Sequence, residues 1–248
     1  MSVLSSVLRL ARRHLRARSH GVNFVGMKRT TLPGQLVFGG HAAPFATPLE
    51  TLLVADFTNV VLDDDYGLRT MRPIPSTIVD IGTNVGFFTK FARHCFPDAI
   101  IHAYEPSPPT AAYAQTNIQH RLTTLFVEGV AAEPGRAEMQ EHGSSNLAQT
   151  IAGKTGSIVL TSFATVLERI GGRIDLLKVD CEGAEWDFMR DPALFAHVGA
   201  IRMEYHLVDG RTLDDVHRLA DKIGFKVTKL DENSGFGIAW LDRIAHAP

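Results

Sequence analysis

The sequence is poor in cysteine and has no long apolar run. Only Cys95 and Cys181 occur among 248 residues. No C-x-x-C pair is present, which excludes a disulfide framework and a paired-cysteine metal site. A reduced, cytoplasmic setting is the default for such a chain. No stretch approaches the roughly 18–20 consecutive apolar residues of a membrane-spanning helix. The length instead suits one sizeable hydrophobic core with an appendage.

Acidic residues are absent from the first 49 positions, which hold seven Lys/Arg; the first acid is Glu50. The rest of the chain holds the other 18 of 25 basic residues and all 27 acidic ones, a balance of −9. The formal net charge of −2 implies no strong attraction to polyanions, which disfavours nucleic acid as a partner. At the N-terminus the apolar residues precede the arginines, whereas a secretory signal peptide has its charged residues first. An organelle-import peptide is a minor alternative.

Residues 1–20 are predicted to form an amphipathic helix that stops near Gly21. At about 100° per residue, one side collects apolar residues and the other collects arginines: Leu4, Val7, Leu8, Ala11 and Leu15 against Arg9, Arg12, Arg13 and Arg16. Two readings stay open. The helix lies on an anionic membrane surface or docks a lipid-linked substrate, as a peripheral element at the inner membrane surface. Alternatively, its apolar stripe packs on the body, or the helix is a frayed arm.

Residues 22–72 carry a weaker pattern. Apolar groups at 35–38, 52–54 and 60–62 suggest short strands or a small helix between Pro- and Gly-containing turns. We expect this segment to be a lid over one end of the site. Asp63, Asp64 and Asp65 are interpreted as a solvated turn in preference to a metal cluster.

From residue 74 onward, strand and helix patterns alternate. Strands are expected at 77–81, 100–104, 124–128, 174–179, 199–205, 225–230 and 236–241, and helices at 87–96, 107–119, 162–170, 184–190 and 212–223. A hairpin-like insert occupies 130–160. This alternation predicts a mostly parallel sheet covered on both faces. The last two strands are joined too closely for a parallel crossover, so they pair antiparallel. The predicted units are 1–21, 22–72 and 73–248.

A glycine turn follows the first of these strands. Asp80 stands two residues before Gly82, and Gly86 comes four residues later. A dinucleotide site has G-x-G-x-x-G instead. The shorter turn suits a cofactor without a pyrophosphate but with a charged amino-acid tail. A carboxylate such as Asp80 can meet the ammonium of that tail directly or through water, and Asn84 can hydrogen-bond to the same tail. The alternative is a tight turn that binds nothing.

Three further polar groups fall at predicted strand ends. Glu105 lies 23 residues after Gly82, near the offset of about 20 at which an acid accepts ribose hydroxyls. Asp180 ends the strand at 174–179, where it faces the reactive end of a cofactor. His206 ends the next strand and titrates near neutrality, so it is the first candidate for a general base, with Asp180 second. A hydrogen-bonded histidine without a chemical role is the alternative. Lys178 is expected to pair structurally with Asp180, Glu182 or Glu204.

These motifs resemble the FkbM family of S-adenosylmethionine-dependent methyltransferases. The run Asp80–Gly86 is similar to its D-I-G-A-N-x-G motif, with Thr83 where alanine is usual. Glu105-Pro106 is similar to its E-P motif, and 177–185 to K-I-D-V-E-G-A-E. Glu204-Tyr205-His206 is similar to the late E-Y-H-like strand of the family. The resemblance covers about residues 60–242.

The resemblance implies a class I methyltransferase fold of the α/β class. This is a Rossmann-like three-layer sandwich whose seven-stranded, mostly parallel sheet has an antiparallel last strand. It implies O-methylation with S-adenosyl-L-methionine, leaving S-adenosyl-L-homocysteine. No metal is expected, because Asp180 lacks an Asp-Asn partner set nearby. The residues expected at the cofactor are Asp80, Gly82, Thr83, Asn84, Gly86, Phe87, Glu105, Pro106, Val130, Ala131 and Asp180.

The acceptor is expected to be a hydroxyl of a sugar, glycan or glycolipid, for example a bacterial lipo-oligosaccharide. Alternatives are a polyketide or another small secondary metabolite and, from another class, a non-catalytic nucleotide- or nucleic-acid-binding module. Acceptor pockets in this fold are built from insertions, here 22–72 and 130–160. In the second insertion, Ser144, Ser145 and Asn146 either contact a sugar or cap a turn.

Overall fold

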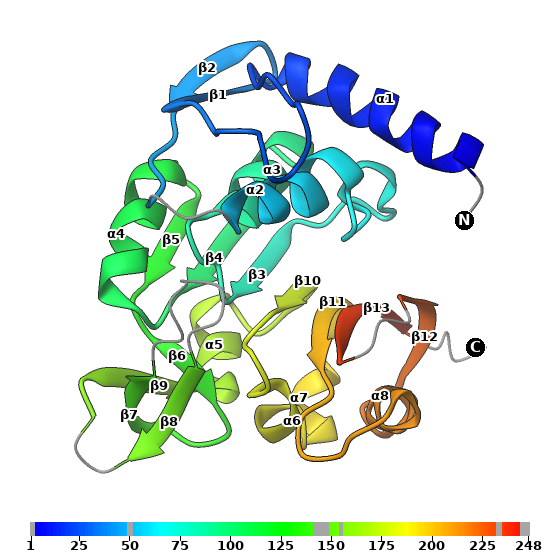
Figure 1. Cartoon of the computed structure of the whole chain (residues 1–248). Helices are drawn as coiled ribbons and strands as arrows, with labels where there is room; N and C mark the ends of the chain where they lie inside the picture. The colour runs from blue at the N-terminus through cyan, green and yellow to red at the C-terminus, as the bar shows by residue number, and fades with distance from the viewer. Residues whose placement is uncertain (1–2, 49–51, 141–148, 154–155, 232–234, 244–248) are drawn as a thin grey trace.

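The computed structural model describes residues 3–48, 52–140, 149–153, 156–231 and 235–243. Its centre is a seven-stranded sheet with the strand order β12-β13-β11-β10-β3-β4-β5 (Figure 1). The strands are β3 (Thr77–Ile81), β4 (Ile100–Tyr104), β5 (Thr123–Phe126), β10 (Ile174–Val179), β11 (Val198–His206), β12 (Phe225–Leu230) and β13 (Phe236–Arg243). β13 is antiparallel to both neighbours, and the remaining pairs are parallel. The predicted seven-stranded sheet with an antiparallel last strand is confirmed.

Helices cover both faces of this sheet. The bounds are α3 (Phe87–Cys95), α4 (Pro108–Asn117), α5 (Phe163–Arg169), α6 (Glu185–Phe188), α7 (Pro192–Phe195) and α8 (Leu213–Lys222). Successive strand residues point to opposite faces. Accordingly, Ile78 joins the core cluster that contains α3, while Val79 joins the cluster that contains α5 to α8. The result is a three-layer sandwich, and the carboxyl ends of the parallel strands meet at one edge.

The N-terminal segment packs on the α3 side of the sheet. It comprises α1 (Val3–Ser19), the antiparallel hairpin β1 (Gln35–Phe38) and β2 (His41–Pro44), α2 (Leu53–Asp56), the π-helical η1 (Phe57–Asp63) and the 3-10 turn η2 (Leu68–Thr70). Gly21 adopts φ +74 just after α1, in agreement with the predicted stop. The groups at 52–54 and 60–62 are helical, which decides between the two expectations stated for them. The boundaries at 21 and 72 stay predictions.

The insert after β5 forms a second sheet of order β6-β9-β7-β8. Its strands are β6 (Gly129–Ala131), β7 (Gly135–Gln140), β8 (Gln149–Gly153) and β9 (Ile158–Ser162). β7 and β8 form the expected antiparallel hairpin, whereas the parallel β6–β9 pair was not predicted. Ser144, Ser145 and Asn146 lie outside the described residues.

The predicted helix at 184–190 is present but shorter than expected. It contains α6 (Glu185–Phe188), and a second short helix, α7, which was not predicted, begins beyond it at Pro192. Asp191 caps the second by accepting a hydrogen bond from the Ala193 N–H, and Pro192 occupies its first turn, where a missing N–H costs nothing. None of the helices that the structure describes combines the length and apolarity that crossing a bilayer requires.

Candidate active site

The turn between β3 and α3 is a glycine loop whose shape depends on Gly82 and Gly86. Gly82 has φ +75, and a Cβ there would lie 1.7 Å from the Asp180 carbonyl oxygen. Gly86 has φ +98, and a Cβ there would lie 2.5 Å from Ile118 Cγ2. Between them, Asn84 also adopts a positive φ of 51. Only glycine fits both ends of the loop, because a side chain would clash in addition to straining the backbone.

Asp80 stabilises this loop through hydrogen bonds. The side chain is fully buried; its Oδ2 accepts hydrogen bonds from Thr83 Oγ1 at 2.6 Å and Thr89 Oγ1 at 2.7 Å. Its Oδ1 lies 3.2 Å from Lys178 Nζ. These protein groups disfavour a direct contact between Asp80 and a cofactor ammonium, and the predicted contact, directly or through water, stays a prediction. Thr83, at the position where the family motif usually has alanine, contributes to this stabilisation through its hydrogen bond to Asp80.

Asn84 presents an unsatisfied group at this loop. Its backbone N–H donates to Glu105 Oε2 at 3.0 Å, but its side-chain Oδ1 is buried without a hydrogen-bond partner among the described residues. A buried amide oxygen left unpaired costs free energy, so a ligand donor at this position would be stabilising. This agrees with the expectation that Asn84 meets the tail of a cofactor.

Glu105 stands at the end of β4, held by two backbone groups. Besides the Asn84 N–H, the Ser107 N–H donates to its Oε1 at 2.9 Å. Both carboxylate oxygens are thereby oriented, yet each has a lone pair left for a hydroxyl. Burial raises the pKa of Glu105 to about 7, although the two N–H groups act in the opposite direction. A diol that donates to both oxygens would stabilise the charged form.

Pro106, Val130 and Ala131 belong to the neighbourhood of Glu105 and not to the cavity described below. A Cβ added at Gly129 in β6 would lie 3.5 Å from Pro106 Cβ, so β6 runs beside the end of β4. Val130 is buried in the core cluster, while Ala131 is half-buried at the strand end. Their predicted contact with a cofactor stays a prediction.

Lys178 and Asp180 join the next strand end to the glycine loop. The Lys178 Nζ lies 3.3 Å from Asp180 Oδ2 and donates to the carbonyl oxygens of Ile81 and Gly82. Burial lowers the pKa of Lys178, but the charges of Asp180 and Asp80 outweigh it and raise the pKa overall. Lys178 is therefore a charged crosslink between β3 and β10, and its predicted structural pairing with Asp180 is present.

His206 ends β11 between two carboxylates. Its Nε2 lies 3.1 Å from Glu182 Oε2 and its Nδ1 lies 3.3 Å from Glu185 Oε1. Both ring nitrogens thus face acceptors, which requires the doubly protonated imidazolium. Burial alone lowers the pKa of His206, but Glu182 and Glu185 raise it to about 11. A ring that already holds its proton cannot accept another, so this geometry disfavours the predicted role of His206 as general base, which stays a prediction.

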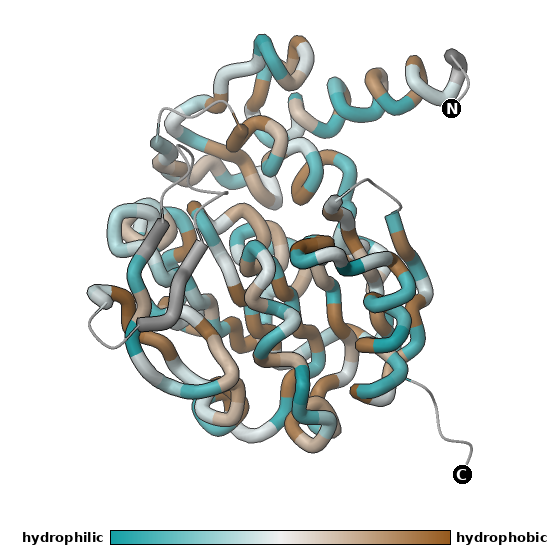
Figure 2. The backbone as a smooth tube through the Cα atoms, turned by 60° about the horizontal axis from the view of Figure 1, so that its bottom comes forward, coloured by the Kyte–Doolittle hydropathy of each residue, from teal (hydrophilic) through white to brown (hydrophobic). Residues whose placement is uncertain are grey.

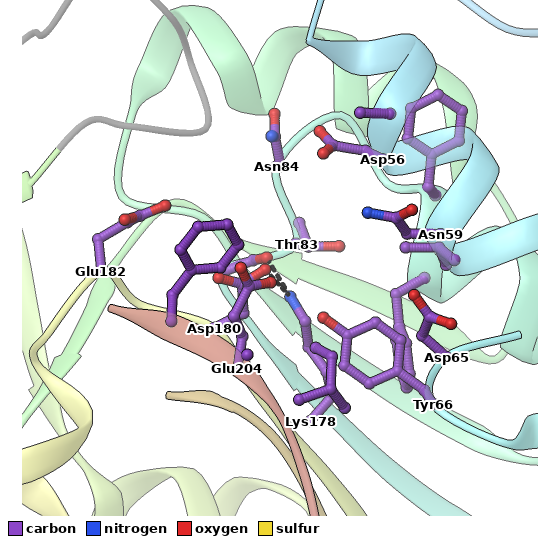
Figure 3. A pocket seen from close by; sticks show the side chains of 18 of the residues that line it. Asp56, Asn59, Asp65, Tyr66, Thr83, Asn84, Lys178, Asp180, Glu182 and Glu204 are labelled. Atoms are coloured by element: carbon purple, nitrogen blue, oxygen red, sulfur yellow. Dashed lines mark hydrogen bonds and ion pairs between the residues drawn. The ribbon is translucent and has the colours of Figure 1, made fainter. Parts of the chain in front are cut away.

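A cavity of about 380 Å³ opens beside the loop (Figure 3). Five of the expected cofactor residues line it, together with His206: Gly82, Thr83, Asn84, Phe87 and Asp180. The opposite wall comes from the N-terminal segment and from β13. These lining residues include Ala55, Asp56, Asn59, Val60, Asp65, Tyr66, Phe236 and Ile238. Segments distant in sequence therefore enclose a space next to the cofactor loop.

Two side chains that were not predicted to be functional point into this cavity. Tyr66 is only 3% exposed, and Figure 3 shows its hydroxyl directed toward Lys178 and Asp180. No hydrogen bond to that hydroxyl is present among the described residues. Burial, followed by the charges of Asp180 and Glu204, raises the pKa of Tyr66 well above its usual value, so the hydroxyl stays a donor.

Glu204 is the second such side chain. It lines the cavity from β11 and has neither a hydrogen bond nor an ion pair within the described part of the chain. Burial, and then the neighbouring charge of Asp180, raise the pKa of Glu204 well above its usual value. The charges of His206 and Lys178 lower this pKa, but by less. A buried carboxyl group with a perturbed pKa in a cavity is a candidate for proton transfer. The feature of the sequence that could have identified Glu204 is its position near the end of the predicted strand 199–205.

Among the described residues, no cluster of three or more His, Cys, Asp or Glu side chains has a geometry that could hold an ion. The acidic run 63–65 is instead divided among three tasks. Asp63 pairs with Arg13, Asp64 accepts hydrogen bonds from the Leu68 and Arg69 N–H groups, and Asp65 lines the cavity.

With this geometry in place, the comparison with known families is decisive. The pattern described as "Methyltransferase FkbM domain" matches residues 80–227, which span the glycine loop, Glu105, Asp180 and Glu204. The chain belongs to the FkbM methyltransferase family. It is a methyltransferase with the class I fold.

Relatives of this FkbM methyltransferase include "Methyltransferase 1" of Beauveria bassiana (strain ARSEF 2860). That protein is 27% identical over 220 residues, which cover 76% of this chain and 82% of the relative.

Similar solved structures include magnesium protoporphyrin IX methyltransferase from Synechocystis PCC 6803 with bound SAM. Its TM-score is 0.49 at 11% identity, covering 81% of this chain and 88% of that one. Precorrin-6y C5,15-methyltransferase from Geobacter metallireducens GS-15 gives a TM-score of 0.47 at 13% identity, covering 73% and 87%.

Proposed function

We propose that this FkbM methyltransferase transfers a methyl group from S-adenosylmethionine to a hydroxyl of a sugar, glycan or glycolipid. The observation that carries the proposal is the cavity beside the glycine loop, which unpartnered polar side chains enter. The residues present fit the cofactor. Asn84 Oδ1 awaits a donor, Glu105 offers two oriented oxygens, and the bare Gly82 backbone admits close approach.

Within this proposal, each residue of the loop has a separate task. Glu105 accepts the ribose hydroxyls, and Asn84 takes the amino-acid tail. When bound, S-adenosylmethionine supplies an electrophilic methyl group, and the chemistry of transfer resides in the cofactor. The protein must hold the acceptor oxygen in line and keep water out. Phe87, which is buried beside the cavity, contributes to that exclusion.

The general base in this proposal is Glu204. An alcohol is a poor nucleophile while protonated, so a positioned base contributes about 10²- to 10⁴-fold. The ionised form of Glu204, whose population rises with pH, takes the proton of the acceptor hydroxyl as the acceptor oxygen gains the methyl group. Asp180 is less suited because Lys178 neutralises it at 3.3 Å. Tyr66 donates a hydrogen bond that orients the acceptor.

The polar wall of the cavity supports a hydroxyl-rich acceptor. Asn59, Asp65 and Glu204 offer acceptors to sugar hydroxyls, while Phe236 offers an apolar face from β13. A polyketide or another secondary metabolite is the second candidate. The cytoplasmic setting belongs to this proposal as well, supported by the free thiols Cys95 and Cys181.

A labelled-methyl screen tests this function. The full chain is incubated with methyl-labelled S-adenosylmethionine and panels of sugars, glycolipids and polyketides, and products are identified by mass spectrometry. The proposal expects label on a hydroxyl oxygen of a carbohydrate. Label on a polyketide would favour the second candidate, and label on nitrogen or carbon would contradict O-methylation.

A further inference from the structure

Helix α1 presents its apolar side to solvent instead of to the protein. The exposed fractions are 58% for Val7, 57% for Leu8 and 69% for Leu15. Figures 1 and 2 show the N-terminal half of the helix projecting from the rest of the structure. A helix that served only to cover the core would bury these side chains, because large apolar residues are stabilised by removal from water.

The arginine side of α1 is the side that packs on the body. Arg13 donates to Asp63 through Nε at 3.0 Å, and Arg16 donates to the carbonyl oxygen of Leu62. Ala17, one residue on, is fully buried. These contacts fix the rotation of the helix about its axis. Of the two readings that the sequence left open, packing of the apolar stripe on the body is therefore wrong.

Basic side chains flank the exposed stripe. At 3.6 residues per turn, Arg12 and Arg18 lie about 60° to either side of Leu15. Both are exposed, and no acid occurs in the first 49 residues. An apolar stripe bordered by arginines is the pattern of a helix lying in the plane of a lipid surface, with the guanidinium groups at the phosphates.

The loop after α1 extends the same kind of surface. Its Phe24 packs edge-on against His14 of the helix at 5.7 Å between ring centroids, so the loop lies beside α1. Val25 and Met27 are 53% and 45% exposed, and Lys28 and Arg29 are exposed next to them. Basic and apolar side chains thus continue beyond the helix.

We propose that the α1 face formed by Val7, Leu8 and Leu15, with Arg12 and Arg18 at its borders, binds an anionic lipid bilayer. Charge complementarity selects this occupant, because the surface is basic while the remainder of the chain is acidic. α1 packs on η1, and Asn59 and Val60 of η1 line the cavity. Bilayer binding would therefore bring the cavity to a lipid-linked acceptor, a consequence that rests on the proposed function.

Vesicle sedimentation of the full chain tests this inference. Wild type is expected to pellet with vesicles of equimolar phosphatidylcholine and phosphatidylglycerol and not with phosphatidylcholine alone, and added salt should release it. The variant Leu8→Ser/Leu15→Ser should lose at least about tenfold in affinity for the anionic vesicles. The matched control Ile74→Ser replaces a 65% exposed apolar residue elsewhere and should pellet like wild type.

Two results would overturn the inference. One is equal pelleting of wild type and Leu8→Ser/Leu15→Ser. The other is failure of wild type to bind the anionic vesicles, accompanied by a dimer on size-exclusion chromatography that Leu8→Ser/Leu15→Ser abolishes, which would assign the face to a second copy. Titration of the Leu8→Ser/Leu15→Ser variant with S-adenosylhomocysteine separates bilayer binding from the proposed function. The variant should bind S-adenosylhomocysteine like wild type, because the cofactor loop is unchanged.

Discussion

Glu204 and His206 stand two residues apart on β11 and face different environments. His206 lies between Glu182 and Glu185, which raise its pKa and so favour its protonated form. Glu204 has no hydrogen bond or ion pair among the described residues. Burial and Asp180 raise its pKa, and the charges of His206 and Lys178 lower it by less. The pattern of the strand placed both at the site, but side-chain partners brought in by α6 and the acidic loop decide their ionisation. Those partners could not be read from spacing along one strand.

Exchanging Glu204 for glutamine should lower turnover by about 10²- to 10⁴-fold, since the amide cannot accept the proton of the acceptor. Affinity for S-adenosylhomocysteine should stay unchanged. The acid limb of the wild-type rate profile should vanish in Glu204→Gln, whereas His206→Gln should retain it. Steady-state kinetics with the acceptor found in the methyl screen give the answer. A wild-type rate in Glu204→Gln would remove this residue from the mechanism.

The pH dependence of cofactor binding should follow Glu105. Its pKa of about 7 means that the carboxylate takes up a proton as the pH falls below neutrality. Ribose hydroxyls donate to the charged form, so affinity is present above the pKa and declines below it. From about pH 8 to about pH 6 the affinity for S-adenosylhomocysteine should fall about tenfold. In Glu105→Gln, the affinity for S-adenosylhomocysteine should be lower and should not change with pH over this range. If the affinity still changed with pH in this variant, another residue would be the titrating group.

At the scale of elements, the glycine loop joins β3 to α3 and touches β10. Sequence periodicity predicted β3, β4, β10 and β12 with their observed bounds, because buried apolar runs between turn residues define such strands. It placed a helix at 184–190 where α6 occupies only Glu185–Phe188, and it did not predict α7, which begins at Pro192. The π-helical η1 was also beyond prediction, because its register is set by packing against α1 and α3 and not by a local pattern.

Placing alanine at Gly82 should disrupt the loop and abolish S-adenosylhomocysteine binding. The new Cβ would lie 1.7 Å from the Asp180 carbonyl oxygen, so β10 and the loop must separate. Gly210→Ala is the matched control, because Gly210 has the same φ of +75 and nothing within 4 Å of an added Cβ. It should cost only about 1 kcal/mol and retain binding. Calorimetric titration of both variants makes the comparison; equal affinity would refute a steric role for Gly82.

At the scale of the whole molecule, the cavity unites residues from α2 to β13. The pattern of the sequence predicts the cofactor side, because three polar residues follow parallel strands whose ends meet at one edge. For the acceptor side it predicts only an insertion. Tyr66 and Asp65 lie in a segment without strong periodicity, and their position depends on how η1 packs on α3. Long-range packing of this kind leaves no signature in residue spacing.

Stability of the whole fold should depend on the Lys178 crosslink. Replacing it in Lys178→Met leaves Asp80, which is fully buried, without its positive partner. Removing one member of a buried ion pair costs about 3–5 kcal/mol, so the midpoint of thermal unfolding should fall clearly. Lys226→Met, at an exposed position of β12, should leave it nearly unchanged. Differential scanning calorimetry compares the two variants. A similarly small change of the unfolding midpoint in both would contradict a stabilising role of Lys178.

The central claim is that the glycine loop and Glu105 together bind S-adenosylmethionine. Isothermal titration of the full chain with S-adenosylhomocysteine tests it directly, with NAD as the competing nucleotide and Glu105→Ala as the variant. The account predicts heat of binding for S-adenosylhomocysteine to wild type, none for NAD, and loss of binding in Glu105→Ala. Binding of NAD, or the same S-adenosylhomocysteine affinity in wild type and Glu105→Ala, would contradict it.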